Sequence, residues 1–147
     1  MIDSVREYIS ECPYLDEITP VNVDYLTDDV KAYSVNEGIS YDPVIDKDIL
    51  KNEYSQFQFT FDAKLYWNDE ENNNIDNSKF LEDFSNWLRE NNRKKIFPVI
   101  DDESIVVESI GTISSGYIQD TNADEAIYRI SCVMYYTRYI NIKEEEI

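Results

Sequence analysis

The strongest constraint in the sequence is a stretch in which hydrophobic side chains occupy every second position. A period of two is that of a β-strand with one buried face. Because burial of one phenylalanine contributes about 1.5–3 kcal/mol, we expect this strand to form the centre of the core. Its even-numbered face is left to contact water or a polar partner. The hydrophobic positions of this stretch are Phe57, Phe59, Phe61, Ala63, Leu65 and Trp67.

A second long strand is predicted over 125–139. Its even-numbered positions from Ala126 to Tyr136 are apolar, as one buried face requires. Its odd-numbered face begins with Arg129 and turns apolar near its end, so both faces need cover there. A packed helix would provide that cover, and so would a neighbouring subunit. Shorter strands are predicted over 21–25, 31–35 and 105–113, with a turn at 36–38.

Two helices complete the predicted elements. The first is short, has hydrophobic residues at helical spacing from Val5 to Cys12, and ends at Pro13. The second is predicted to begin near Ser78, after a solvated loop over 68–77, and carries an apolar stripe. Basic side chains follow that stripe, and we interpret them as charges that complement the helix dipole rather than as an anion site. They are Arg89, Arg93, Lys94 and Lys95.

The architecture that these elements predict is α+β, a mostly antiparallel β-sheet flanked by two helices. A length of 147 residues fits one domain. We expect that domain to cover 1–140 and an acidic C-terminal tail to cover 141–147. Hydrophobic residues make up 42% of the chain and aromatic residues 14%, which supplies a core and argues against intrinsic disorder.

Net charge excludes several functions. The chain has 31 acidic and 13 basic residues, a formal charge of −18. Binding to nucleic-acid phosphates or to an anionic membrane needs a basic surface, so neither is expected. No apolar run approaches the roughly 20 residues that span a bilayer. Charged residues from Asp3 to Glu7 stand where a secretory signal needs an apolar stretch, so we expect the protein to stay in the cell that makes it.

Catalytic chemistry has little support in the sequence. The chain has no histidine, which removes the commonest general base and zinc ligand. Adjacent carboxylates such as Asp28-Asp29 are interpreted as solvated surface, and no phosphate-binding or calcium-binding motif is present. Cys12 and Cys132 have no companion cysteine nearby and are expected to be buried thiols. We therefore expect no enzyme, no metal and no cofactor; a cation-dependent enzyme ranks last among the hypotheses.

The acidic charge is compatible with two different functions. An acidic surface repels DNA, which is useful where DNA must pass close to protein without adhering. The same surface resembles DNA to a basic protein partner. Short hydrophobic and aromatic strings are also informative, because they follow one another in a particular order. They are Tyr8-Ile9, Cys12-Pro13-Tyr14-Leu15, Val23-Asp24-Tyr25-Leu26, Tyr33-Ser34-Val35, Gln56-Phe57-Gln58-Phe59, 77–88, Ser115-Gly116-Tyr117 and 126–136.

In their order, these strings resemble a family of small proteins encoded in the structural-gene clusters of phages and prophages of Gram-positive bacteria. Its members are labelled minor capsid or head–tail proteins, and we group them with the tail terminators. A similar protein closes the tail end in phage-tail-like bacteriocins. The resemblance extends from Val5 to Tyr136. Because the strings are hydrophobic, they argue for a shared fold more than for a shared site, and the family offers no catalytic residues.

The resemblance implies a virion structural protein that forms a ring, typically a hexamer, on the last ring of the tail tube. Such a ring stops tube polymerisation and joins the tube to the head connector or collar. The implied partners are further copies of the chain, the tail tube protein, the sheath and the connector. The implied location is the host cytoplasm during assembly and then the virion or tail-like particle.

Two sets of residues are candidates for these contacts. Aromatic and apolar side chains at the ends of the long strands are candidates for subunit contact, although packing inside one monomer is the competing interpretation. Acidic residues in two loops are candidates for the lumen of a ring, and ordinary solvated loops are the competing interpretation. The contact candidates are Tyr66, Trp67, Val133, Tyr135 and Tyr139. The lumen candidates are Asp69, Glu70, Glu71, Asp101, Asp102 and Glu103.

The alternative function is that of a DNA mimic, an acidic inhibitor that occupies the basic groove of a nucleic-acid-binding protein. A DNA mimic needs carboxylates at phosphate-like spacing and a basic partner. A tail terminator instead needs self-assembly and affinity for the ends of tail tubes.

Overall fold

Two helices and seven strands form an α+β fold in the computed structural model, which describes residues 1–29, 31–38, 43–66, 71–121 and 124–140. The side chains of 71–74 are likewise left undescribed. The elements are α1 (Ile2–Ser10), β1 (Val21–Val23), β2 (Ala32–Glu37), β3 (Val44–Lys47), β4 (Glu53–Tyr66), α2 (Glu71–Arg93), β5 (Ile105–Thr112), β6 (Tyr117–Thr121) and β7 (Glu125–Arg138).

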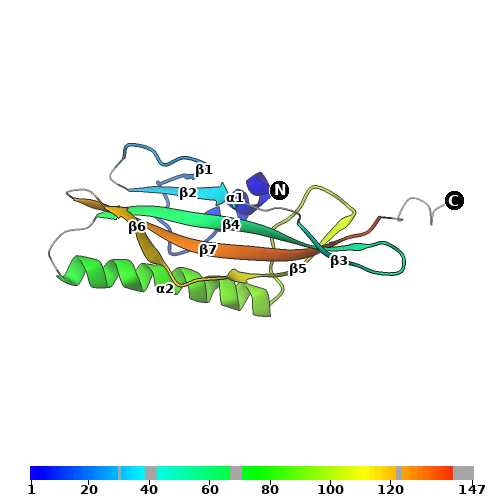
Figure 1. The fold of residues 1–147 in the computed structure, drawn as a ribbon. Coiled ribbons are helices and arrows are strands. Elements are labelled where there is room, and N and C mark those ends of the chain that lie inside the picture. Colours follow the sequence, from blue (N-terminus) through cyan, green and yellow to red (C-terminus); the bar gives the residue numbers. More distant parts are fainter. Residues whose placement is uncertain (30, 39–42, 67–70, 122–123, 141–147) are drawn as a thin grey trace.

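The centre of the sheet is the antiparallel pair of β4 and β7, which lie side by side in Figure 1. The two strands pair along their whole length, from Glu53 opposite Arg138 to Tyr66 opposite Glu125. Both long strands were predicted from their period of two, and the buried odd face of β4 and even face of β7 are confirmed. β4 begins earlier than predicted because the alternation continues back through buried Ser55.

The remaining strands flank this pair. β2 and β3 pair with successive parts of β4, and β5 and β6 pair with successive parts of β7. β1 runs parallel to β2, and the other strand pairs in the described residues are antiparallel. The sheet is therefore mixed but mostly antiparallel. The free side of β5 is covered by α2, where the side chain of Asn92 accepts a hydrogen bond from the Ile110 N–H at 3.0 Å.

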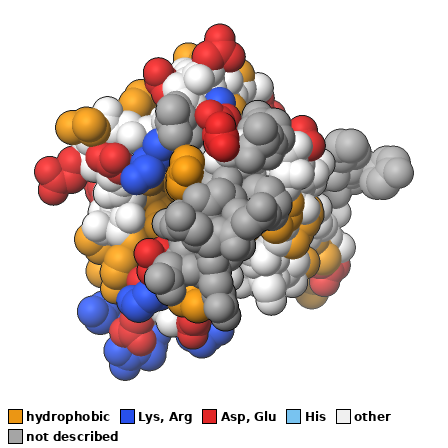
Figure 2. Space-filling view, turned by 90° about the vertical axis from the view of Figure 1, so that its left-hand side faces the viewer, with side chains coloured by type: hydrophobic (Ala, Val, Ile, Leu, Met, Phe, Trp, Pro, Cys, Tyr) orange, Lys and Arg blue, Asp and Glu red, His pale blue; other side chains and the backbone are white. Residues whose placement is uncertain are grey.

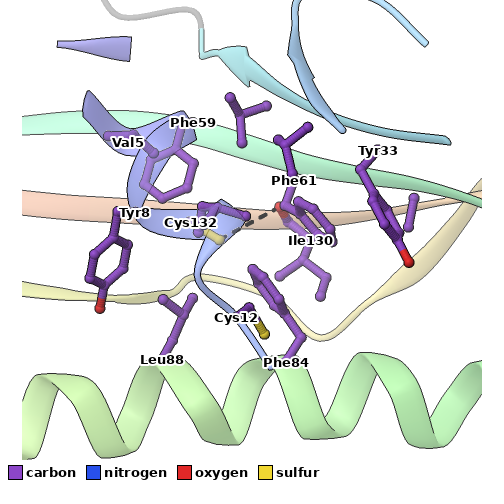
Figure 3. Packing of buried hydrophobic residues seen from close by; sticks show 14 of the residues in the cluster. Val5, Tyr8, Cys12, Tyr33, Phe59, Phe61, Phe84, Leu88, Ile130 and Cys132 are labelled. Atoms are coloured by element: carbon purple, nitrogen blue, oxygen red, sulfur yellow. Dashed lines mark hydrogen bonds between the residues drawn. The ribbon is translucent and has the colours of Figure 1, made fainter. Parts of the chain in front are cut away.

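Both helices pack on the same face of the sheet. α1 contacts β1 and β2, and α2 contacts β5. The helices also contact each other, because the rings of Tyr8 and Trp87 lie 5.2 Å apart and the Tyr8 hydroxyl accepts a hydrogen bond from Asn91. Figure 3 shows Phe84 of α2 directed at the sheet, where its ring stacks on Phe61 with centroids 4.4 Å apart. The hydrophobic core thus lies between one sheet face and two helices.

The predicted turn at 36–38 is wrong. β2 continues through Glu37, and Asn36 pairs with Thr60 of β4. The Asn36 side chain is also held, because its amide donates hydrogen bonds to β4. Gly38 is needed for a different reason than positive φ: a Cβ there would lie 2.8 Å from the carbonyl oxygen of Gln58. The glycine therefore permits close approach of two backbones.

The predicted start of the second helix is also wrong. α2 begins at Glu71, so 71–77 are helical where a solvated loop was predicted. Asn77 does not cap the helix; its side-chain amide donates a hydrogen bond to the carbonyl oxygen of Tyr66 at 2.8 Å. This bond ties the early part of α2 to the end of β4. Asparagine costs only about 0.7 kcal/mol or less relative to alanine in a helix, so such tertiary contacts can override its preference.

Replacement of Phe84 should be strongly destabilising. Phe84 is fully buried and stacks on Phe61, so Phe84→Ala leaves a cavity between α2 and the sheet. We expect the free energy of unfolding to fall by about 3–5 kcal/mol. Val99→Ala is the control, because Val99 is 86% exposed. Urea denaturation followed by circular dichroism measures both variants, and a loss as small as that of the control would contradict the core described above.

The two thiols should be inert in the folded protein. Cys12 and Cys132 are both buried, as predicted, and desolvation raises the pKa of Cys12 to about 11. Burial raises the pKa of Cys132 as well. We expect a chromogenic disulfide reagent at mildly alkaline pH to modify neither thiol until urea unfolds the chain. Rapid modification of either cysteine without denaturant would contradict this prediction.

Candidate assembly surfaces

The sheet face opposite the helices bears most of the candidate residues. Within the described residues both helices pack against the other face, so no helix covers this one. The side chains of β4 that point to it are mostly polar and half-buried, with an exposed tyrosine at each end of the strand. A connecting segment adds partial cover at one edge, where the Lys64 ammonium donates a hydrogen bond to the carbonyl oxygen of Thr27. We call this surface the open face.

A buried ion pair lies in the middle of the open face. The Asp62 side chain is 6% exposed and accepts two hydrogen bonds of 2.8 Å from the guanidinium of Arg129 on β7. Asn36 of β2 donates a third hydrogen bond to Asp62 at 2.9 Å. The hydrogen bond from Arg129 to Asp62 and the carboxylate charge raise the pKa of Arg129. This network links three strands, so it fixes their register on a face with little apolar packing.

A cluster of exposed tyrosines occupies one end of the open face. Tyr54 pairs with Thr137 of β7, so it lies between Tyr135 of β7 and Tyr139, which follows the end of that strand. Val106 pairs with Thr137 from the other side. These four side chains, Tyr54, Tyr135, Tyr139 and Val106, are 39%, 41%, 38% and 48% exposed. We call them the tyrosine patch. The negative charge of Asp48 is the main reason that the pKa of Tyr54 is raised, so an acidic group borders the patch.

The structure places the predicted contact residues in two regions. Tyr135 and Tyr139 belong to the tyrosine patch, whereas Tyr66 is 48% exposed at the opposite end of β4. Val133 is only 8% exposed, and Trp67 lies outside the described residues. Sequence reasoning missed Tyr54 and Val106. The predicted strand began at Phe57, whereas β4 begins at Glu53. Continuing its alternation back to the true start would have placed Tyr54 on the open face.

The described residues of the predicted lumen set lie in two separate segments of the chain. Asp101, Asp102 and Glu103 are exposed in the segment before β5, and Asp102 lies 3.2 Å from Arg138 at the end of β7. Glu71 is the first residue of α2 rather than part of a loop, which corrects the prediction, and it follows the opposite end of β4. Asp69 and Glu70 fall outside the described residues. The two acidic segments thus belong to opposite ends of the central strand pair.

Within the acidic segment, one carboxylate is already occupied. Asp102 accepts hydrogen bonds from the Ser104 hydroxyl and the Ser104 N–H, at 2.6 and 2.9 Å, and these bonds lower its pKa. Asp102 therefore shapes the turn before β5. Its neighbours Asp101 and Glu103 are the carboxylates that this segment presents to solvent.

Five of the basic residues lie on α2 or directly after it. Figure 2 looks at the molecule from the left side of Figure 1, and basic side chains collect at its lower edge, the level of α2. Arg93 pairs with Glu90 at 2.7 Å, and Lys95 adopts a positive φ of 59° as the helix ends. The N–H of Ile96 donates back to Asn91, which closes the helix in the manner typical of a left-handed terminal residue. This geometry agrees with helix-end charges, the interpretation given above.

A groove with a largely polar lining lies between α2 and the β5–β6 connection. It has a volume of about 370 Å³ and is lined by Ser78, Leu81, Glu82, Ser85, Asn86, Arg89, Thr112, Ser114, Ser115 and Gly116. Its hydroxyl and amide groups can bind polar ligands by hydrogen bonds. The chain has no histidine to activate one of these hydroxyls as a nucleophile. The described residues contain no group of three or more Cys, Asp or Glu side chains arranged to hold a metal ion.

Two comparisons of the sequence with known proteins found no match. None of the protein-family models searched matches the chain, and no curated protein sequence matches it. In the part of the chain that the structure describes, neither helix is long and apolar enough to cross a bilayer. Functional arguments therefore depend on the surfaces described above and on the sequence strings.

Loss of Arg129 should destabilise the protein more than loss of another arginine. Arg129→Met leaves the buried Asp62 carboxylate without its guanidinium partner. We expect a loss of about 3 kcal/mol, near the low end for a buried pair because Arg129 itself is partly exposed. Arg138→Met is the control, since its partner Asp102 is exposed, and should cost less than about 1 kcal/mol. Equal losses in urea denaturation would show that the buried pair has no special role.

Proposed function

We propose that the protein is a tail-terminator-like structural protein, which forms a ring on the end of a phage tail tube or of a related bacteriocin particle. The observation that supports this proposal best is the tyrosine patch on a sheet face that no described helix covers. The resemblance of the sequence strings to tail terminators is the reason for proposing a ring on the tail tube. In this proposal the protein is not an enzyme and needs no cofactor.

The composition of the patch suits a protein interface. Tyrosine is enriched at interfaces because it buries a large area while its hydroxyl can still find a partner. Tyr135 and Tyr139 each expose about two fifths of their surface, and neighbouring Val106 exposes about half. A standard interface buries about 800 Å² per partner, so contacts beyond the patch must contribute too.

The charge of the chain suits a ring around a DNA channel. Asp101 and Glu103 present carboxylates that would repel DNA phosphates if this segment faced the lumen. A ring of subunits with a charge of −18 each also repels itself, so its assembly should strengthen as salt screens that repulsion. The proposed partners are further copies, the tail tube protein, the sheath and the head connector. The proposed location is the host cytoplasm during assembly and the finished particle afterwards.

The DNA mimic is the second candidate, and the acidic charge is the observation that favours it. It predicts a monomer that binds a basic nucleic-acid-binding protein. It gives no role to the tyrosine patch.

The proposal can be tested by measuring mass in solution. Light scattering behind a sizing column, with and without tail tubes of the cognate particle, should show a ring of about six subunits, either free or on tube ends. Tyr135→Asp should shift the protein toward the monomer, because it places a charge in the tyrosine patch. Tyr25→Asp is the matched control, since Tyr25 is 59% exposed outside the patch. A wild-type monomer indifferent to tubes would contradict the proposal and favour the DNA mimic.

A further inference from the structure

The turn between β3 and β4 presents apolar side chains to solvent. Ile49 is 97% exposed and Leu50 is 59% exposed, although turns are usually polar. Figure 1 shows this hairpin extending beyond the rest of the sheet, at the end of the molecule away from the start of α2. We call residues 48–51 the hairpin tip.

The hairpin tip is held in a defined shape. The N–H of Lys51 donates to the Asp48 carbonyl at 2.9 Å, and the Asp48 N–H donates to the Asn52 carbonyl at 3.1 Å. The Asp48 carboxylate also accepts two hydrogen bonds from Asn52. Lys51 has a positive φ of 68°, which completes the reversal. Because the turn is fixed by these bonds, little conformational entropy is lost when its apolar side chains meet a partner.

A pocket lined by both aromatic and charged side chains lies at the other end of β4. It has a volume of about 440 Å³, within the range of about 300–1,000 Å³ typical of binding pockets. Tyr14 and Tyr66 are about half exposed at its edge, whereas its inner wall belongs to the core. The rings of Tyr33 and Phe80 in that wall stack 6.1 Å apart, so the wall is formed before anything binds. The apolar lining residues are Tyr14, Leu15, Tyr33, Leu65, Tyr66 and Phe80.

At each feature lies a charged side chain without an ion-pair partner among the described residues, and the two have opposite signs. The pocket lining includes Asp16, Asp76 and Lys31, and Asp16 pairs with Lys31 at 3.6 Å. Asp76 is exposed and has no ion-pair partner among the described residues. Lys51 of the hairpin tip is likewise exposed and makes no ion pair within the described ranges. Among the residues that the structure describes, the hairpin tip therefore carries a cation without an ion-pair partner beside exposed apolar side chains. The pocket carries an anion without an ion-pair partner in that part of the chain, beside aromatic side chains.

The tip of a chain cannot enter its own pocket. The tip precedes Glu53 and the pocket includes Tyr66, so the fourteen residues of β4 separate them. At about 3.3 Å per residue, the thirteen steps from Glu53 to Tyr66 span roughly 43 Å. A contact between two different surfaces of identical subunits is heterologous. It repeats head to tail and gives a ring where the rotation between copies closes, and an open filament where it does not.

We propose that Ile49 and Leu50 of one copy insert into the aromatic pocket beside Tyr14 and Tyr66 of the next copy, with Lys51 pairing with Asp76. The occupant of the pocket is therefore a second copy of this chain. This inference rests on the proposed function, because it assigns the repeated contact of the proposed ring. The proposed contact lies at the ends of the subunit and is separate from the tyrosine patch.

Cysteine cross-linking tests the contact in the full-length chain. The double variant Lys51→Cys with Asp76→Cys, which keeps the apolar anchor Ile49, should give a ladder of covalent oligomers on a non-reducing gel when an oxidant is added. The native thiols do not interfere, because both are buried. The matched control replaces Asp76→Cys with Val99→Cys, at a position 86% exposed, and should give no ladder. No ladder with the first pair, or equal ladders with both pairs, would overturn the proposal.

A second pair of variants measures the contribution of the tip. Ile49→Ser should raise the protein concentration needed for half-assembly by about tenfold or more, because it removes the apolar anchor. Ile18→Ser is the control, since Ile18 is 89% exposed and does not line the pocket. Lys51→Glu should also weaken assembly, and adding Asp76→Lys should restore it. Failure of this charge exchange to restore assembly would count against the pairing.

The outcomes separate this contact from the proposed function. If light scattering shows a ring in wild type and an equal ring in Ile49→Ser, the ring stands and the tip contact is wrong. If wild type never forms a ring on tube ends but the double-cysteine ladder appears, the contact stands and the terminator proposal is wrong. Cross-linking of the tip to the tube protein instead of to a second copy would overturn the choice of occupant.

Discussion

The pairing of β4 with β7 is the constraint on which the rest of the structure depends. Every other strand except β1 pairs with one of these two, and β1 is attached through β2. Because the pairing is in register over fourteen residues, the apolar sides of both strands fall on one face. The helices then have a single surface to cover. A slip of one residue would move Phe61 to the solvent side and remove the stacking partner of Phe84.

The same pairing leaves a second face whose stability has a different origin. On that face the strands are joined by the Asp62–Arg129 ion pair and the Asn36 amide rather than by apolar packing. Directional bonds specify register, and they leave the surrounding surface available for contact. The aromatic side chains stand apart from this network, at the end of the strands. One face thus combines a buried ion-pair network with the exposed tyrosine patch.

Sequence periodicity predicts the parts of this fold that have one buried side. β4 and β7 were found in this way. β6 was missed because all five of its residues are exposed, so no alternation marks it. The start of α2 was missed because contacts such as that of Asn77 with Tyr66 decide it. The pocket was beyond sequence reasoning, since its walls come from the α1–β1 connection, β2, β4 and α2.

The bond between Asn92 and Ile110 also has a consequence for how copies can meet. A bare strand edge invites another strand, and uncontrolled edge pairing leads to aggregation. Here one edge N–H is occupied by a helix side chain, and β1 at the other edge has only three residues. Strand addition is therefore hindered at Ile110 of β5 and kept short at β1, whereas β3 and β6 each pair with only one strand among the described residues. At the β5 and β1 edges, contact between copies through strand pairing is thus disfavoured.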